Sequence, residues 1–245
     1  MNVILKTNEY IENLQFNGLQ IILNTQLPSF TTDAVLLSDF SKLKSNDVVC
    51  DLGTGTGILP ILIYGRYNAK VTGFEIQPSL CDMAGRSFIL NGIDDYLNAI
   101  CIDIKDAYKS HNGKFTALVC NPPYFNNDSD LASTDKARAI SRICSDTTLN
   151  DFMCASNKLL KSGGKAYFCY PAAKLCDLIC CLRNNSLEPK RIRFVRSKQS
   201  KSPYLILVEA KKDGGKGNIC FENDLIIYNE NNTETEEIKR IYHRD

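Results

Sequence analysis

Short apolar runs alternate with helical patterns along most of this chain. Seven runs have the length and residue types of buried strands, at 47–51, 69–75, 98–103, 116–120, 165–171, 190–196 and 204–210. Helical patterns lie between them, at 57–67, 78–92, 148–164 and 173–185. This alternation predicts an α/β fold: a doubly wound, Rossmann-like, seven-stranded and mostly parallel sheet with helices on both faces.

The two ends of the chain depart from this alternation. Near the start, residues 14–23 hold Asn17-Gly18 between two apolar runs, which is typical of a β-hairpin. Near the end, a polar, Glu-rich stretch surrounds the single apolar run 225–228. We therefore expect one domain, 1–245, made of a hairpin and helix extension at 1–45, a catalytic core at 46–210 and a C-terminal extension at 211–245.

A glycine-rich turn separates the first predicted strand of the sheet from the helix that follows. Gly53, Gly55 and Gly57 follow Asp51 in the pattern D-x-G-x-G-x-G. Ligands of doubly wound sheets bind outside the carboxyl ends of the strands, where glycines let a ligand approach the backbone. The turn is shorter than the G-x-G-x-x-G dinucleotide fingerprint and favours a less anionic ligand. Tight turns also use glycine for steric reasons alone, so this pattern needs further support.

Acidic residues at the ends of the next two strands supply that support. Glu75 ends the second strand and is suited to accept both hydroxyls of a ribose, Ile76 is suited to cover an adenine, and Asp103 ends the third strand. Taken singly, each carboxylate is explained equally well as a solvated strand end. Together with the turn, they resemble the cofactor site of class I methyltransferases, which implies S-adenosylmethionine as the cofactor.

The fourth strand leads into Asn121-Pro122-Pro123-Tyr124, where a short polar loop is usual. Such a strand lies beside the first strand in the doubly wound order, so its end faces the methyl donor. The Asn121 side chain and the Pro122 carbonyl are suited to accept hydrogen bonds from an exocyclic amino group, and the two prolines keep these acceptors rigid. Tyr124 is suited to stack on a flipped base, with Phe125 as a second wall. The alternative is a rigid loop with an aromatic lid.

The tetrapeptide in this context resembles the signature of amino methyltransferases that act on adenine N6, guanine N2 or glutamine amides. The segments 27–40, 75–92, 159–171 and 187–195 narrow the resemblance to a bacterial family that methylates N6 of an adenine in the anticodon loop of a valine tRNA. It implies that Thr32 and Asp33 lie against the cofactor, and that Asp51, the turn glycines, Glu75, Ile76, Asp103 and Asn121 bind it. The stretch 137–152 lacks a glutamate that this family usually carries after the tetrapeptide, so the substrate contacts of 126–150 are not assigned.

A basic segment near the end of the core is the candidate RNA-docking surface. Its cations are Lys190, Arg191, Arg193, Arg196, Lys198 and Lys201, with no acid among them, whereas 222–237 contains six acids and no base. Phosphate contacts provide most non-specific affinity for nucleic acids. Basic side chains also protect exposed strand edges, which is the alternative explanation.

Composition limits the remaining possibilities. The formal net charge is +1, so any attraction to nucleic acid is local rather than global. Eleven scattered cysteines suit reduced thiols in a cytoplasmic protein, and the cluster Cys176, Cys180 and Cys181 lacks the spacing and the histidines of a zinc site. We expect no metal, no membrane span, no cleavable leader and a monomer.

Three functional hypotheses follow. The first is S-adenosylmethionine-dependent N6 methylation of an adenine in tRNA. The second is another amino methyltransferase, acting on a release-factor glutamine, rRNA or DNA; it is disfavoured because only about 46 residues precede the core and no target-recognition domain is evident. The third is a non-catalytic RNA-binding protein that retains the cofactor, which the intact motifs argue against.

Overall fold

A single mixed sheet forms the centre of the protein. The structure is a computed structural model that describes residues 3–27, 31–123 and 147–243. Within these ranges the sheet has nine strands in the order β10-β8-β9-β7-β6-β3-β4-β5, with β11 also paired to β8. The seven predicted strands are all present, as β3 (Val48–Leu52), β4 (Lys70–Glu75), β5 (Leu97–Cys101), β6 (Phe115–Cys120), β7 (Leu160–Pro171), β8 (Leu187–Arg196) and β9 (Leu205–Lys212).

The strand directions place the ends of the central strands at one edge. β3 pairs in parallel with both β4 and β6, and β6 pairs in parallel with β7. The chain therefore proceeds outward from β3 to β5, returns to β6 on the other side of β3, and creates a switch point between them. β9 runs antiparallel to both β7 and β8.

Two strands in the sheet were not predicted. β10 (Cys220–Phe221) and β11 (Leu225–Ile226) each pair in parallel with β8 and extend the sheet from seven to nine strands in the described residues. Two residues are too few to produce the alternating pattern that identifies a strand. The C-terminal extension is thus bonded to the edge of the sheet.

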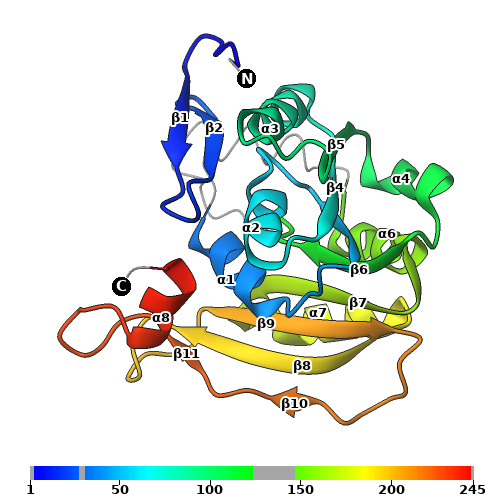
Figure 1. The fold of residues 1–245 in the computed structure, drawn as a ribbon. Coiled ribbons are helices and arrows are strands. Elements are labelled where there is room, and N and C mark those ends of the chain that lie inside the picture. The colour runs from blue at the N-terminus through cyan, green and yellow to red at the C-terminus, as the bar shows by residue number, and fades with distance from the viewer. Residues whose placement is uncertain (1–2, 28–30, 124–146, 244–245) are drawn as a thin grey trace.

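Helices cover both faces of the sheet (Figure 1). One layer contains α1 (Thr32–Phe40), α2 (Ile58–Tyr67), α3 (Pro78–Leu90) and α8 (Glu236–Tyr242). The opposite layer contains α4 (Ile104–His111), α6 (Leu149–Leu159) and α7 (Leu175–Asn184), the last preceded by the short 3-10 helix η1 (Ala172–Lys174).

Helix α4 was missed and helix α6 is shorter than predicted. α4 is only eight residues long, is mostly polar and buries only Ile104 and Ala107, and Asp103 caps it by accepting a hydrogen bond from the Lys105 amide. α6 ends at Leu159 rather than at 164, because the chain turns extended at Leu160 and Gly163 and Gly164 belong to β7.

Alternation along the central strands separates two hydrophobic cores. Val49, Val119 and Cys169 face the layer of α1, α2 and α3, whereas Cys50 and Cys120 face the layer of α4, α6 and α7. Since successive side chains of a strand point to opposite faces, Asp51 and Asn121 belong to the α1 side.

The predicted hairpin is present, but its first strand lies earlier in the sequence. β1 (Glu9–Asn13) pairs antiparallel with β2 (Gln20–Asn24), and Asn17-Gly18 lies in the loop between them. Ile22 packs against Leu80 and Met83 of α3, beside which the hairpin is drawn in Figure 1. Arg86 of α3 forms an ion pair of 2.7 Å with Glu9 and so binds β1 to this helix.

Candidate active site

A pocket of about 300 Å³ opens at the carboxyl ends of β3, β4 and β6. It lies at the switch point where ligands of doubly wound sheets bind. Its walls come from the turn after β3, the end of β4, the starts of α1, α3 and α4, and the residues after β6. Of the predicted site residues it brings together Asp51, Gly53, Gly55, Glu75, Ile76, Asp103, Asn121 and Pro123.

The glycine turn is fastened to the end of β4. The amides of Gly53 and Thr54 donate to the Phe74 carbonyl at 2.9 and 3.1 Å, and the Gly55 amide donates to Oε2 of Glu75 at 2.9 Å. All three motif glycines have positive φ, which disfavours other residues. The turn is therefore held in place by backbone and carboxylate contacts before any ligand binds.

The motif glycines fall into two classes. A Cβ on Gly57 would lie 2.8 Å from the Phe88 ring, so this glycine serves close packing between α2 and α3. A Cβ on Gly55 would meet no atom within 4 Å, although Gly55 lines the pocket. The space beside Gly55 is therefore open to a ligand. Gly57, in contrast, is required for steric reasons alone.

Asp51 is the least satisfied polar group in this pocket. Its side chain is 1% exposed, and neither carboxylate oxygen has a hydrogen-bond partner among the described residues. Burial raises the pKa of Asp51 to about 7; the nearby Thr54 hydroxyl opposes this shift and the charge of Glu75 adds to it. The Thr54 hydroxyl also lacks a partner within the described ranges. A cationic or hydrogen-bond-donating ligand would stabilise the charged form of this carboxyl.

Glu75 and Asp103 are held by backbone amides. Glu75 is 5% exposed and accepts from the amides of Gly55 and Gln77, both at 2.9 Å. Each oxygen retains a lone pair for a ligand. Asp103 caps α4 through the Lys105 amide at 2.8 Å and also lines the pocket. Ile76 is 45% exposed on the wall, an unusual exposure for an apolar residue next to a buried carboxylate.

Asn121 lines the pocket directly after β6. The thiol of Cys169 on β7 donates to its Oδ1 at 3.0 Å. Pro123 also lines the wall, and Pro122 is buried. Tyr124 and Phe125, the predicted stacking residues, lie outside the described residues.

At the start of α1, the pocket is lined by the residues on either side of the predicted pair Thr32 and Asp33. Thr31 and Ala34 line the pocket, whereas Thr32 and Asp33 are not part of its wall. Asp33 nevertheless lies near the site. Burial raises the pKa of the Cys169 thiol, and the negative charge of Asp33 raises it further.

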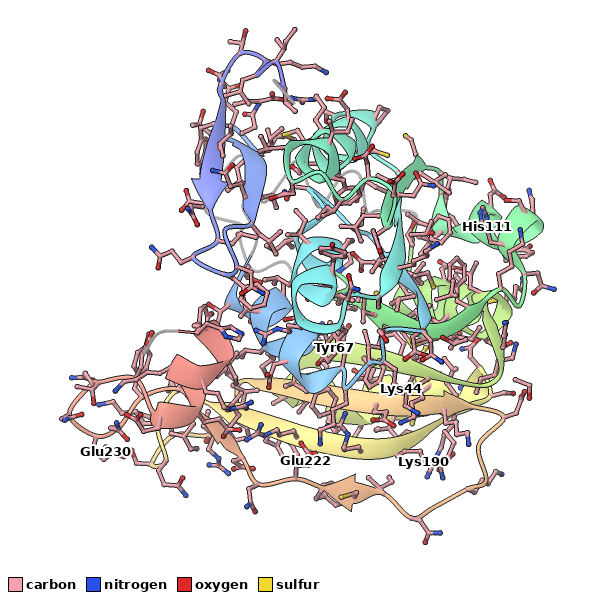
Figure 2. The ribbon with its side chains drawn as sticks, viewed as in Figure 1. Lys44, Tyr67, His111, Lys190, Glu222 and Glu230 are labelled. Carbon is pink, nitrogen blue, oxygen red and sulfur yellow. The ribbon has the colours of Figure 1, made fainter. Side chains whose placement is uncertain are left out.

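The basic segment of β8 is paired within the molecule. Arg191 is 8% exposed, pairs with Glu209 at 2.9 Å and with Glu222 at 3.1 Å, and stacks its guanidinium 3.8 Å from the Phe40 ring centre. Figure 2 shows Glu222 and Lys190 along the β8 and β10 edge. Four of the other cations contact the C-terminal extension: Lys190 the Gly215 and Gly217 carbonyls, Arg193 Glu237, Arg196 Asp224, and Lys198 the Glu230 carbonyl.

These contacts change the interpretation of the basic segment. Three acids of 222–237 pair with three of these cations: Glu222 with Arg191, Glu237 with Arg193 and Asp224 with Arg196. These pairs attach the C-terminal extension to the sheet, and Arg191 is mostly buried among them.

We expect Arg191→Ala to reduce the free energy of unfolding by about 1.5–3 kcal/mol, because it removes the buried hydrogen-bonded ion pair with Glu209 and leaves that carboxylate with Lys165, at 2.9 Å, as its remaining cation. Chemical denaturation measures this loss. Lys198→Ala, which removes only a contact to the Glu230 carbonyl, is the matched control and is expected to cost less than about 1 kcal/mol. Equal losses in the two variants would contradict the structural role of Arg191.

Several residues of the site were not predicted. Thr54 and Thr56 lie in the "x" positions of the glycine motif and line the pocket, as does Phe152 from α6. Phe152 is distant in sequence and gives no local signal. Cys169 shows only an apolar strand pattern, and its contact with Asn121 depends on the pairing of β6 with β7.

Among the described residues, no group of three or more His, Cys, Asp or Glu side chains is placed to hold a metal ion. Within the same ranges, no helix has the length and apolar character needed to cross a membrane.

The chain is similar to known proteins in sequence and in structure. Residues 31–172 match the family model "Methyltransferase small domain". Two relatives named tRNA1(Val) (adenine(37)-N6)-methyltransferase come from Actinobacillus pleuropneumoniae serotype 7 and Shewanella woodyi. The first is 27% identical over 94% of this chain and 95% of its own, and the second is 25% identical over 81% and 82%.

Solved structures share the fold at low sequence identity. A predicted O-methyltransferase from Agrobacterium tumefaciens, Atu636, has a TM-score of 0.71 and 17% identity over 87% of this chain and 96% of its own. Methanocaldococcus jannaschii Trm5, solved in complex with adenosine, has a TM-score of 0.60 and 16% identity over 86% of this chain and 57% of its own.

Proposed function

Because this chain belongs to the family of small methyltransferase domains, we propose that it transfers a methyl group from S-adenosylmethionine to N6 of an adenine in tRNA. The observation that carries the proposal is the position of Asn121, which borders the same pocket as the glycine turn and as Asp51, whose carboxylate has no hydrogen-bond partner among the described residues. The relatives' names support the choice of substrate, adenine 37 in the anticodon loop of a valine tRNA.

The residues of the pocket fit this cofactor. S-adenosylmethionine supplies a methyl group on a positively charged sulfur, together with an ammonium group, a ribose and an adenine. Asp51 is suited to the ammonium, since its buried oxygens have no partner in the part of the chain that the structure describes. Glu75 has lone pairs for the ribose hydroxyls, Ile76 offers an apolar face to the adenine, and Asp103 is suited to accept from the adenine amino group.

The residues after β6 are suited to the acceptor. An exocyclic amino group is a poor nucleophile because its lone pair is delocalised into the ring. Acceptance of its hydrogens by Asn121 Oδ1 and the Pro122 carbonyl orients the lone pair and favours charge on nitrogen. These acceptors follow a buried strand and are restrained by two prolines, so little reorganisation is required.

The test is methyl transfer by the purified protein to unmodified valine tRNA, with nucleosides identified by mass spectrometry. We expect one N6-methyladenosine per tRNA, lost when the adenine at position 37 is replaced by guanine. Transfer only to rRNA, DNA or the glutamine of a release factor would support a related amino methyltransferase instead. Cofactor binding without transfer to any of these would support a non-catalytic protein.

The two classes of glycine give a matched pair of variants. We expect Gly55→Ala to weaken S-adenosylmethionine affinity at least about tenfold, since its methyl group occupies ligand space, while costing only about 1–2 kcal/mol of stability from its positive φ. Gly57→Ala adds a clash with Phe88 to a φ of +88°, so it is expected to cost more stability, about 2–5 kcal/mol. Calorimetric titration and thermal unfolding measure the two effects, and the reverse ranking would contradict this assignment.

A further inference from the structure

The side chain of Asn121 has a partner that the sequence motif does not contain. Cys169 Sγ lies 3.0 Å from Asn121 Oδ1, a short distance for a thiol donor. Cys169 is fully buried on β7, and its only polar atom is used in this contact. An internal thiol therefore touches the group to which the proposed function assigns the target amino group.

The register of β6 and β7 brings these two residues side by side. Cys120 pairs with Phe168 in the parallel register of β6 and β7, so Asn121 and Cys169 are the next residues along the two strands. Both side chains point to the α1 side, where Cys169 joins the hydrophobic core. Asn121 has thus left the regular strand while its side chain remains anchored to the neighbouring one.

The environment keeps the thiol in its donor form. Burial, assisted by the negative charge of Asp33, raises the pKa of Cys169 well above its ordinary value. The sulfur stays protonated at neutral pH and continues to donate to the amide oxygen. Of the two ends of a carboxamide, only the oxygen accepts this bond, so the thiol favours one of the two amide orientations.

We infer that Cys169 is a positioning residue, whose thiol holds the Asn121 carboxamide in the orientation that accepts hydrogen bonds from the target amino group. This inference rests on the proposed function. The amide oxygen has two lone pairs, so one receives the thiol and the other remains for the substrate. A reversed carboxamide would present N–H donors to an amino group that is itself a donor.

A purely structural role for Cys169 predicts a different behaviour. Cys169 lies in an apolar cluster, so packing alone ranks Cys169→Val above Cys169→Ser in both stability and activity. Positioning through a hydrogen bond ranks them in the opposite order for activity, because Ser retains a donor and Val does not. The two rank orders separate the explanations even though both variants alter the core.

The experiment measures kcat, the KM for tRNA and the cofactor Kd for Cys169→Ser, Cys169→Val and the control Cys50→Ala. We expect kcat within about threefold of wild type for Ser and about tenfold lower for Val, with KM and Kd unchanged, as the loss of one hydrogen bond implies. Cys50 is equally buried but faces the opposite helix layer, so its variant is expected to lose stability without losing kcat. A kcat for Val equal to or above that for Ser would overturn the inference.

A second readout is independent of tRNA methylation. The side-chain amide signal of Asn121 is observed by NMR in protein labelled with ¹⁵N-asparagine and assigned by its absence in Asn121→Ala. We expect this signal to move in Cys169→Val and to remain near its wild-type position in Cys169→Ser. An inactive wild-type protein would refute the proposed function, whereas an unmoved signal in Cys169→Val would refute the positioning role.

Discussion

Asn121→Ala is expected to reduce kcat for tRNA methylation by about 10²–10³-fold while S-adenosylmethionine affinity stays within about threefold of wild type. The variant removes the side-chain acceptor in the wall of the pocket but leaves the glycine turn, Asp51 and Glu75 in place. Single-turnover transfer of a labelled methyl group measures the first quantity, and calorimetric titration of the cofactor measures the second.

An exposed asparagine provides the control for this variant. Asn98 lies on β5, away from the pocket, so Asn98→Ala is expected to leave both quantities unchanged. If Asn121→Ala lost cofactor affinity and kcat in equal proportion, Asn121 would act on the cofactor rather than on the acceptor. Full activity in Asn121→Ala would remove the proposed chemistry altogether.

Asp51→Asn is expected to weaken S-adenosylmethionine binding by about 10- to 100-fold, because it removes the buried charge proposed to hold the cofactor's ammonium group. Wild-type affinity is expected to rise between pH 5.5 and 7.5, as the carboxyl of the free protein loses its proton near its pKa of about 7. We expect the cofactor affinity of Asp51→Asn to show no such rise with pH. Titrations across the pH range test both statements, and a parallel pH dependence in the two proteins would contradict the role of Asp51.

The same substitution is expected to stabilise the protein without cofactor. The folded pKa of Asp51 is raised from 3.8 to about 7, so the folded state holds its proton more tightly than the unfolded state. The contribution of the Asp51 carboxyl to wild-type stability is most favourable below pH 4. It declines as the pH rises to about 7 and is constant above pH 7. Above pH 7 we expect the variant to be more stable by about 4 kcal/mol, with little difference at pH 4. Denaturation curves without cofactor at pH 4 and pH 8 measure this difference, which a greater stability of wild type at pH 8 would contradict.

Local patterns were sufficient for the central part of the fold. Buried parallel strands such as Phe115–Cys120 are continuous apolar runs, and they were identified together with the helices beside them. The short strands β10 and β11 depend on pairing with β8 and not on their own residues, and the sequence pattern does not contain such contacts. The cap of α4 at Asp103 is local, but the helix is short and mostly polar and therefore gives a weak signal.

The sequence alone identifies those residues of the candidate site that lie at the end of a strand. Asp51, Glu75 and Asn121 follow this rule, because parallel strands bring their carboxyl ends to one edge. The partners of the basic segment were not accessible, since Arg191 meets Phe40, Glu209 and Glu222 only after the chain folds back on itself. Cys169 was missed for the same reason, because its role depends on strand register.

The most direct test is a crystal structure of the protein with S-adenosylmethionine or a non-reactive analogue and an anticodon stem-loop of valine tRNA. The account predicts the donor beside the glycine turn, with N6 of the flipped adenine about 3–3.5 Å from the methyl position and Asn121 Oδ1 within about 3.2 Å of N6. An adenine bound outside this pocket, or an Asn121 side chain turned away from N6, would contradict it.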